Sequence, residues 1–134
     1  MIDIENDVFR LVATKLRAKI NPIYVTGEYV KAPPKFPCVT LVAIDNRPVI
    51  STQTTSSMEN HVHITFEINV YSNKSDGKKS ECKSIIKIVD DVLLNLGFNR
   101  LMIQPIQNNL DATIYRMVGR YSSVVSTDGV IFRG

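Results

Sequence analysis

The chain has 134 residues, of which 44% are hydrophobic and 22% are charged, and its formal net charge at pH 7 is +3. This length suits one globular domain that buries about two-thirds of its unfolded surface, and the composition excludes a chain that is disordered throughout. The longest apolar run, residues 41–44, is far shorter than the roughly 18 residues that a membrane-spanning helix needs. The start of the chain, MIDIEND, is acidic where a signal peptide is basic, so we expect a soluble intracellular protein with no membrane partner.

The 16 Lys and Arg residues and the 13 Asp and Glu residues are interspersed along the chain, apart from the pair Lys78-Lys79. Trp is absent, and aromatic residues make up 7% of the chain. Tight nucleic-acid binding usually needs a concentrated basic face and often aromatic stacking platforms. The sequence therefore gives little reason to expect tight binding to nucleic acid, and it predicts no sequence-specific recognition of nucleic acid.

The first expected element is an amphipathic helix over residues 3–20, because the apolar residues there share one side of a helical projection. Asp3 and Glu5 at its start, with Arg17 and Lys19 at its end, complement the helix dipole. A short strand is expected at residues 23–26. Residues 27–37 contain three prolines, which cannot donate to a strand ladder, so a stiff loop is expected there. Residues 38–45 are apolar on both faces and predict an interior strand.

Residues 47–60 form a long polar segment, rich in Ser and Thr, between two predicted strands. Connections of this length are uncommon in compact domains unless they are functional or disordered. We therefore expect either an extended hairpin arm or a mobile loop. Thr52, Thr54 and Thr55 are good strand formers whose backbone groups need partners, so they are candidates for contact with another chain, for example by strand addition.

Residues 61–71, HVHITFEINVY, alternate between apolar and polar residues and predict a strand with one dry face. Residues 79–96 carry an apolar stripe at helical spacing, and Gly97 follows as a C-terminal cap. Packing that stripe onto that face predicts one core that contains Val62, Phe66, Ile68, Ile86, Val89 and Leu93.

Two cysteines occur, one in the predicted strand 38–45 and one on the apolar stripe of the second helix. We expect both Cys38 and Cys82 to be buried, reduced thiols. A disulfide or a nucleophilic cysteine is the alternative.

The C-terminal part predicts a strand at residues 98–107 that Pro105 interrupts, a long strand at 112–126 with Gly119 as the natural place for a bulge, and a short last strand at 130–133. Most links between strands are of hairpin length. We therefore expect a single α+β domain over residues 1–134, in the order α-β-β-β-α-β-β, with a mainly antiparallel sheet of about four to six strands and two helices packed on one face.

Candidate chemical sites are few. His61 and His63 share a strand face with Glu67, but Glu67 lies four residues beyond His63, about 13 Å along a strand, so we expect no metal site. Asp90 and Asp91 project about 100° apart on a helix, so they form no carboxylate pair and are expected to be solvated. No nucleophile elbow, zinc-ligand spacing or dinucleotide glycine pattern occurs in the sequence, so we predict no cofactor and no enzymatic activity.

Neither alternate set of residues in the strand 112–126 is cleanly polar. One set contains Tyr115 and Tyr121, and the other contains Arg116 and Arg120. Two helices cover only one face of a sheet, so these four residues are candidates for contact with another chain, the arginines through forked hydrogen bonds to carboxylates. The alternative is a second face that the chain's own loops shield.

Two stretches, FEINVYSNKSDGKKSECKSIIKIVDDVLLNLGFNR at residues 66–100 and NLDATIYRMVGRYSSVVSTDGVIFRG at residues 109–134, resemble the small neck proteins of tailed phages. The similar features are a strand ending in Tyr-Ser-Asn, a Lys-rich loop, a helix ending in Leu-Gly-Phe, then Tyr-Arg, Gly-Arg-Tyr and a final Asp-Gly turn into Phe-Arg. The family comprises tail terminator, or tail-completion, proteins that join tail to head, including those of contractile phage-like bacteriocin particles. The resemblance covers roughly the second half of the chain.

This resemblance implies a small α+β structural subunit of the virion, made in the host cytoplasm and assembled with itself into a ring, expected to be a hexamer. The ring would cap the tail tube protein and bind the head-side connector or adaptor protein, with DNA passing through it, and would need no cofactor. Two alternatives remain. One is a small enzyme or ligand-binding domain that uses His61, His63 and Lys78, and the other is a host-side adaptor that binds a single partner.

Overall fold

The structure is a computed structural model that describes residues 2–49, 61–106, 112–126 and 131–132. Within these residues the chain forms α1 (Glu5–Lys19), β1 (Tyr24–Thr26), β2 (Cys38–Pro48), β3 (His61–Ser72), α2 (Lys78–Leu96), β4 (Asn99–Ile106), β5 (Tyr115–Ser126) and β6 (Ile131–Phe132). The predicted α+β class, with a mainly antiparallel sheet and two helices on one face, is confirmed.

The strands form one sheet in the order β1-β2-β3-β5-β4, and β6 pairs with the end of β5 beyond β4. β1 runs parallel to β2, whereas the other described pairs are antiparallel. β3 and β5 pair from His61 opposite Ser126 to Ser72 opposite Tyr115 and form the centre of the sheet. Pro105 does not interrupt β4, because β4 is an edge strand in which a missing N–H is tolerated.

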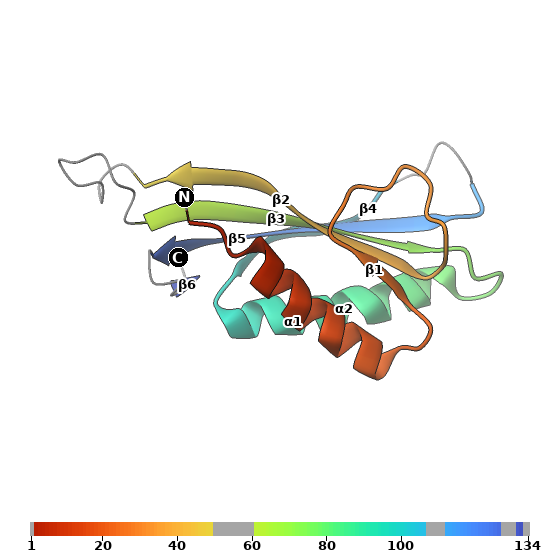
Figure 1. Ribbon diagram of the computed structural model, residues 1–134. Helices are drawn as coiled ribbons and strands as arrows, with labels where there is room; N and C mark the ends of the chain where they lie inside the picture. Colours follow the sequence, from red (N-terminus) through yellow and green to blue (C-terminus); the bar gives the residue numbers. More distant parts are fainter. Residues whose placement is uncertain (1, 50–60, 107–111, 127–130, 133–134) are drawn as a thin grey trace.

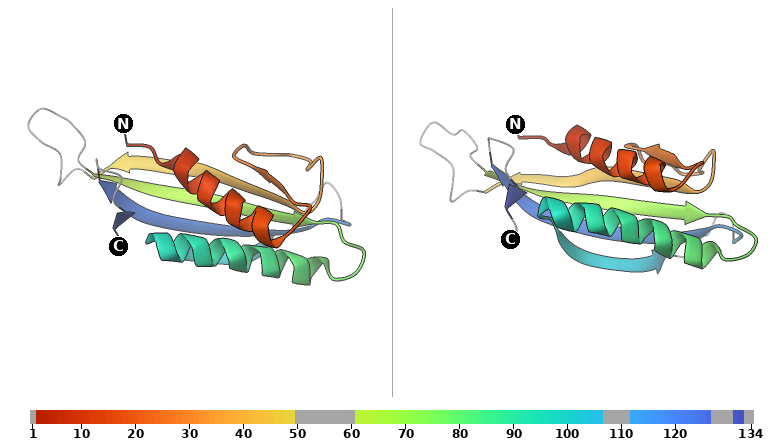
Figure 2. Two further views of the ribbon diagram at one scale, coloured as in Figure 1. Left: turned by 60° about the horizontal axis from the view of Figure 1, so that its bottom comes forward. Right: turned by 90° about the horizontal axis from the view of Figure 1, so that it is seen from below.

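Both helices lie on the same side of the sheet (Figure 1), and from that side they are seen next to each other across it (Figure 2). α2 ends in a glycine cap: Gly97 has φ 107°, its N–H donates to the Leu94 carbonyl, and the Phe98 N–H donates to the Leu93 carbonyl. This pair of bonds is a Schellman motif, and Leu93 and Phe98 are both fully buried, so the cap anchors the helix end in the core. Neither described helix is long and apolar enough to cross a membrane.

The core lies between the sheet and the two helices. It includes all six residues predicted from the patterns of residues 61–71 and 79–96, which confirms that packing. Phe66 of β3 is fully buried at its centre, and its ring meets that of Phe98 edge-on, with ring centroids 5.4 Å apart.

The predicted bulge at Gly119 is wrong. Gly119 pairs in register with Ile68, and the bulges lie instead in β2, between Ala43 and Asp45, and in β4, between Arg100 and Met102. A Cβ atom at Gly119 would lie 3.3 Å from Cδ1 of Ile86 in α2 and 3.1 Å from the Tyr121 ring. The glycine therefore allows close packing of the helix onto the sheet and leaves the ladder continuous.

Cys38 and Cys82 are free and fully buried, as predicted. Burial raises the pKa of Cys38 to about 11 and that of Cys82 to about 12. An unfolded thiol has a pKa of about 8.5, so the stability linked to these thiols is complete below that pH and is lost as the pH rises through the folded values.

We therefore expect the free energy of unfolding of the wild type to fall between pH 8.5 and pH 9.5, by about 1 kcal/mol per thiol. Urea denaturation at the two pH values measures it. The variant with Cys38→Ala and Cys82→Ala should show a clearly smaller fall over the same interval, because a tyrosine of the unfolded chain, with a pKa of about 10, is only about a quarter ionised at pH 9.5. Equal falls in both proteins would contradict the thiol linkage.

Candidate functional site

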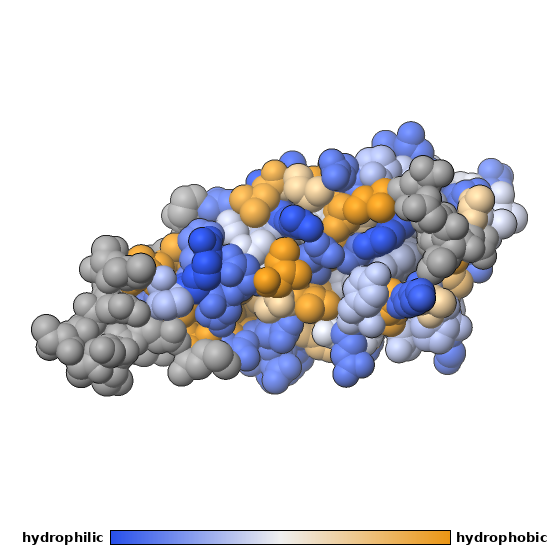
Figure 3. Space-filling view, turned by 90° about the horizontal axis from the view of Figure 1, so that it is seen from above, coloured by the Kyte–Doolittle hydropathy of each residue, from blue (hydrophilic) through white to orange (hydrophobic). Residues whose placement is uncertain are grey.

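The face of the sheet opposite the helices is called the open face here. The register places Val42, Glu67, Arg120 and Met102 next to one another across four strands of this face. Figure 3 looks onto it and shows hydrophobic residues interleaved with hydrophilic ones. The prediction that the second face of the sheet is not cleanly polar is thus confirmed.

A chain of hydrogen bonds, the polar ladder, joins Glu67 and Asn69 of β3 to Arg116 and Arg120 of β5. Arg116 donates to Oδ1 of Asn69 from Nε at 2.9 Å and from Nη2 at 2.7 Å. Nδ2 of Asn69 donates to the Glu67 carboxylate at 3.1 Å. Arg120 donates to Oε2 of Glu67 from Nε at 3.0 Å and from Nη2 at 2.9 Å. The forked arginine contact predicted between chains is therefore already present within this chain.

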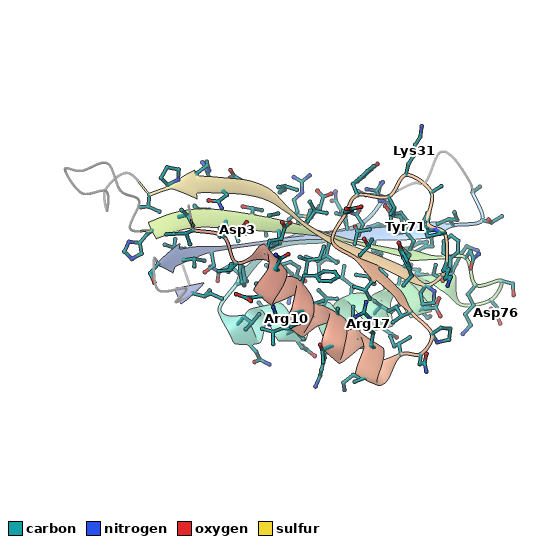
Figure 4. The ribbon with its side chains drawn as sticks, in the orientation of Figure 1. Asp3, Arg10, Arg17, Lys31, Tyr71 and Asp76 are labelled. Atoms are coloured by element: carbon teal, nitrogen blue, oxygen red, sulfur yellow. The ribbon has the colours of Figure 1, made fainter. Side chains whose placement is uncertain are left out.

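One end of the open face is covered by the loop between β1 and β2, residues 27–37, which passes over the sheet (Figure 1). In Figure 4, Tyr71 lies beneath this loop, whereas Lys31 points away from the sheet. Tyr71 is only 2% exposed, and the guanidinium of Arg116 lies over its ring, 5.5 Å from the centroid. At this end, the alternative of a face shielded by the chain's own loop is correct.

Beyond the loop, the open face keeps accessible apolar side chains. Val42, Met102 and Val124 are half-buried. Ile44 and Leu101, which lie at the bulges of β2 and β4, are 46% and 56% exposed. Next to Val42 and Met102, the Arg120 side chain is 49% exposed and the Glu67 side chain is 17% exposed. This mixture of apolar groups with a partly accessible ion pair is typical of a surface that contacts another protein.

Two of the predicted contact residues lie on the other face. Tyr115 packs against the core on the helix side, and Tyr121 is fully buried there. The Tyr121 hydroxyl donates to Oδ1 of Asp90 at 2.6 Å, so its side chain is not on a surface that a second chain can reach. Arg116 and Arg120 are on the open face, and they remain candidates for contact.

Asp90 is not solvated as predicted, because it is 8% exposed and joins three elements. Besides the Tyr121 hydroxyl of β5, it accepts hydrogen bonds from Nε of Arg100 at 2.8 Å and from Nη2 at 3.0 Å, both from β4. Burial, and then the bond to Asp90, raise the pKa of Tyr121 well above its ordinary value. The same carboxylate raises the pKa of Arg100. Asp91, the next residue, is exposed as predicted.

The residues of the alternative enzyme or ligand site are not brought together. His61 and His63 lie at the first residues of β3, whereas Lys78 opens α2, which follows the other end of the same strand. His63 and Ser72 are thus about 30 Å apart along the strand. Glu67, the possible third metal ligand, is engaged by Arg120 and Asn69. Across the described parts of the chain, no group of three His, Cys, Asp or Glu residues is placed to hold a metal ion.

Thr52, Thr54 and Thr55 lie outside the described residues. The chain that leads to and from their segment is a hairpin: Pro48 pairs with Val62, and the Val49 N–H donates to the His61 carbonyl at 2.9 Å. β2 therefore extends three residues beyond the strand predicted at residues 38–45. A groove of about 420 Å³ lies beside this hairpin and is lined by Arg47, Pro48, Val49 and His63.

No protein-family model matches the sequence, and no curated protein matches it either.

Proposed function

We propose that this chain is a structural subunit that caps the tail tube of a phage or phage-like particle as a ring and joins the tail to the head-side connector. The similarity of residues 66–100 and 109–134 to tail terminator proteins supports this proposal. In it, each subunit contacts two neighbours through different surfaces, because a closed ring of more than two copies is built from head-to-tail contacts.

The proposal depends most on the open face, because part of it carries apolar side chains that neither the helices nor the loop of residues 27–37 cover. The helices cover one side of the sheet, and the loop of residues 27–37 covers only one end of the other. The rest presents half-buried Val42 and Met102 on either side of the ion pair between Glu67 and Arg120. A subunit with such a face is stable in water on its own, and burial of the face against a second chain still contributes favourable free energy.

The test targets Met102, because the arginines have a structural role of their own. Charge reversal at Arg120 would place a carboxylate beside Glu67, and charge reversal at Arg116 would remove its hydrogen bonds to Asn69. Both changes would destabilise the subunit itself. Met102→Asp should leave the fold intact, since the side chain is half-buried at an edge strand. It should replace an apolar group of the contact by a carboxylate, which lies beside Arg120 and competes with Glu67 for it. We expect the variant to melt close to the wild type and to be lost from purified particles at least tenfold, as measured by quantitative immunoblotting.

The matched control is Leu11→Asp, which puts the same charge at an exposed apolar residue of α1, on the other side of the sheet. We expect this variant to enter particles as the wild type does. Equal incorporation of all three proteins would reject the open face as the contact surface, and absence of the wild type from particles would reject the proposed function.

A further inference from the structure

Acidic and basic residues are interspersed in the sequence, but in the fold the helices expose mainly their basic side chains. The two helices hold eight of the sixteen Lys and Arg residues and five of the thirteen Asp and Glu residues. Of the acidic residues in the helices, only Asp7 and Asp91 are exposed. Of the eight basic residues, seven are exposed, and together they form what we call the basic helix surface: Arg10, Lys15, Arg17, Lys19, Lys79, Lys83 and Lys87.

The other acidic residues of the helices are turned toward the sheet. Glu5 accepts a hydrogen bond from the Ala43 N–H of β2 at 2.7 Å. Glu81 accepts one from the Ser72 hydroxyl of β3 at 2.6 Å. Asp90 binds Arg100 of β4, as described above. Three carboxylates of the helices are thus engaged by the sheet, so the solvent side of the helix layer is more basic than the charge count of the chain indicates.

We propose that the basic helix surface binds the phosphate backbone of double-stranded DNA without reading its sequence. Lysines spaced four residues apart, Lys79, Lys83 and Lys87, follow α2 at intervals of about 6 Å. Ser80, Ser84 and Asn95 are exposed on the same helix. Lysine, serine and asparagine side chains are the types that contact phosphate oxygens, and counterions released from the duplex supply the free energy of binding.

The composition of this surface favours a duplex over other anionic partners. None of the exposed residues of α2 is apolar, and α1 exposes the apolar residues Leu11 and Ala18, whereas the centre of a protein interface is apolar and depleted of lysine. The apolar stripes of both helices pack on the sheet, so they cannot insert into a lipid surface. Phe9, the aromatic residue of the helices, packs against the core, so these helices offer no stacking platform for single-stranded bases.

The two helices act together in this surface. A groove of about 460 Å³ lies between them, and it brings Lys15 and Lys19 of α1 beside Asp91 and Asn95 of α2. Ile88, Val92 and Leu94 also line it, and Asp91 is the one acidic side chain among the described residues of the lining. The two lysines outnumber Asp91, so the groove adds positive charge between the helices, where a phosphate strand can pass.

This inference goes beyond the proposed function and does not depend on it, because the free chain can be tested. Fluorescence anisotropy of a labelled 30-base-pair duplex would measure binding of the full chain over a range of salt concentrations. If about five phosphates are contacted, the association constant should fall roughly 10² to 10³-fold between 50 and 200 mM salt. The double variant Lys83→Glu and Lys87→Glu should bind at least tenfold more weakly at 50 mM salt, with a slope of log K against log salt about two smaller in magnitude.

The matched control is Lys31→Glu with Lys35→Glu, which changes the net charge equally at two exposed residues of the loop over the open face. We expect it to bind within about threefold of the wild type. Equal losses of duplex affinity in the two double variants would show that only the net charge matters and would overturn the proposal. No binding by the wild type at 50 mM salt would also overturn it, as would tighter binding to phosphatidylserine vesicles or to the single strand than to the duplex.

Discussion

Truncation of Phe66 to Ala should lower the free energy of unfolding by about 3 to 5 kcal/mol. Phe66 is fully buried in the central strand, and its ring meets that of Phe98 edge-on at 5.4 Å. The truncation removes apolar contacts on both sides of the core, and it leaves a cavity that the paired strands β3 and β5 cannot close. Urea denaturation followed by circular dichroism measures the loss.

Leu11→Ala is the control for this truncation, because Leu11 is 50% exposed on α1. Its cost should stay within about 0.5 kcal/mol, since an exposed leucine buries little area and alanine favours a helix. A cost below about 1 kcal/mol for Phe66→Ala would contradict the packing of the helix layer on β3.

The second large effect is expected at Asp90. Replacement by Ala leaves the buried Tyr121 hydroxyl without its acceptor and frees Arg100, so we expect a loss of about 3 kcal/mol in the free energy of unfolding. Asp90→Asn keeps an oxygen for the Tyr121 hydroxyl but removes the ion pair, and should cost about half as much. Thermal and urea denaturation at pH 7 measure both.

The neighbouring residue supplies the control. Asp91 is exposed, so Asp91→Ala should change the free energy of unfolding by less than about 0.5 kcal/mol. Similar effects of Asp90→Ala and Asp91→Ala would show that the bonds from Tyr121 and Arg100 to Asp90 do not stabilise the fold.

The helices and strands were predictable where the apolar residues follow a single spacing, either every second residue as in a strand or every three to four residues as in a helix. The alternation of residues 61–71 and the helical stripe of residues 79–96 both identified the core, because local spacing decides which side chains share a face. Asp90 carried a partial signal, since it lies four residues after Ile86 and three before Leu93, on the edge of that stripe. Its partners Tyr121 and Arg100 lie on other strands, and spacing within one segment does not report such contacts.

The surfaces were less predictable. The alternation of residues 112–126 separated Tyr121 from Arg120 correctly, but it did not show which set faced the helices. The polar ladder depends on the register of β3 with β5, which places Glu67 opposite Arg120. The basic helix surface likewise depends on bonds from Glu5 and Glu81 to the sheet. Pairings between distant segments decided both features.

The proposed place of this chain is a ring at one end of a tail. Electron microscopy of purified particles, with gold directed against an affinity tag on the chain, tests it most directly. The expected result is label confined to the head-proximal end of each tail, and tails without label when the tagged chain carries Met102→Asp, because that variant should not be incorporated. Label spread along the tube, or particles without label although the tagged wild type is expressed, would contradict the account.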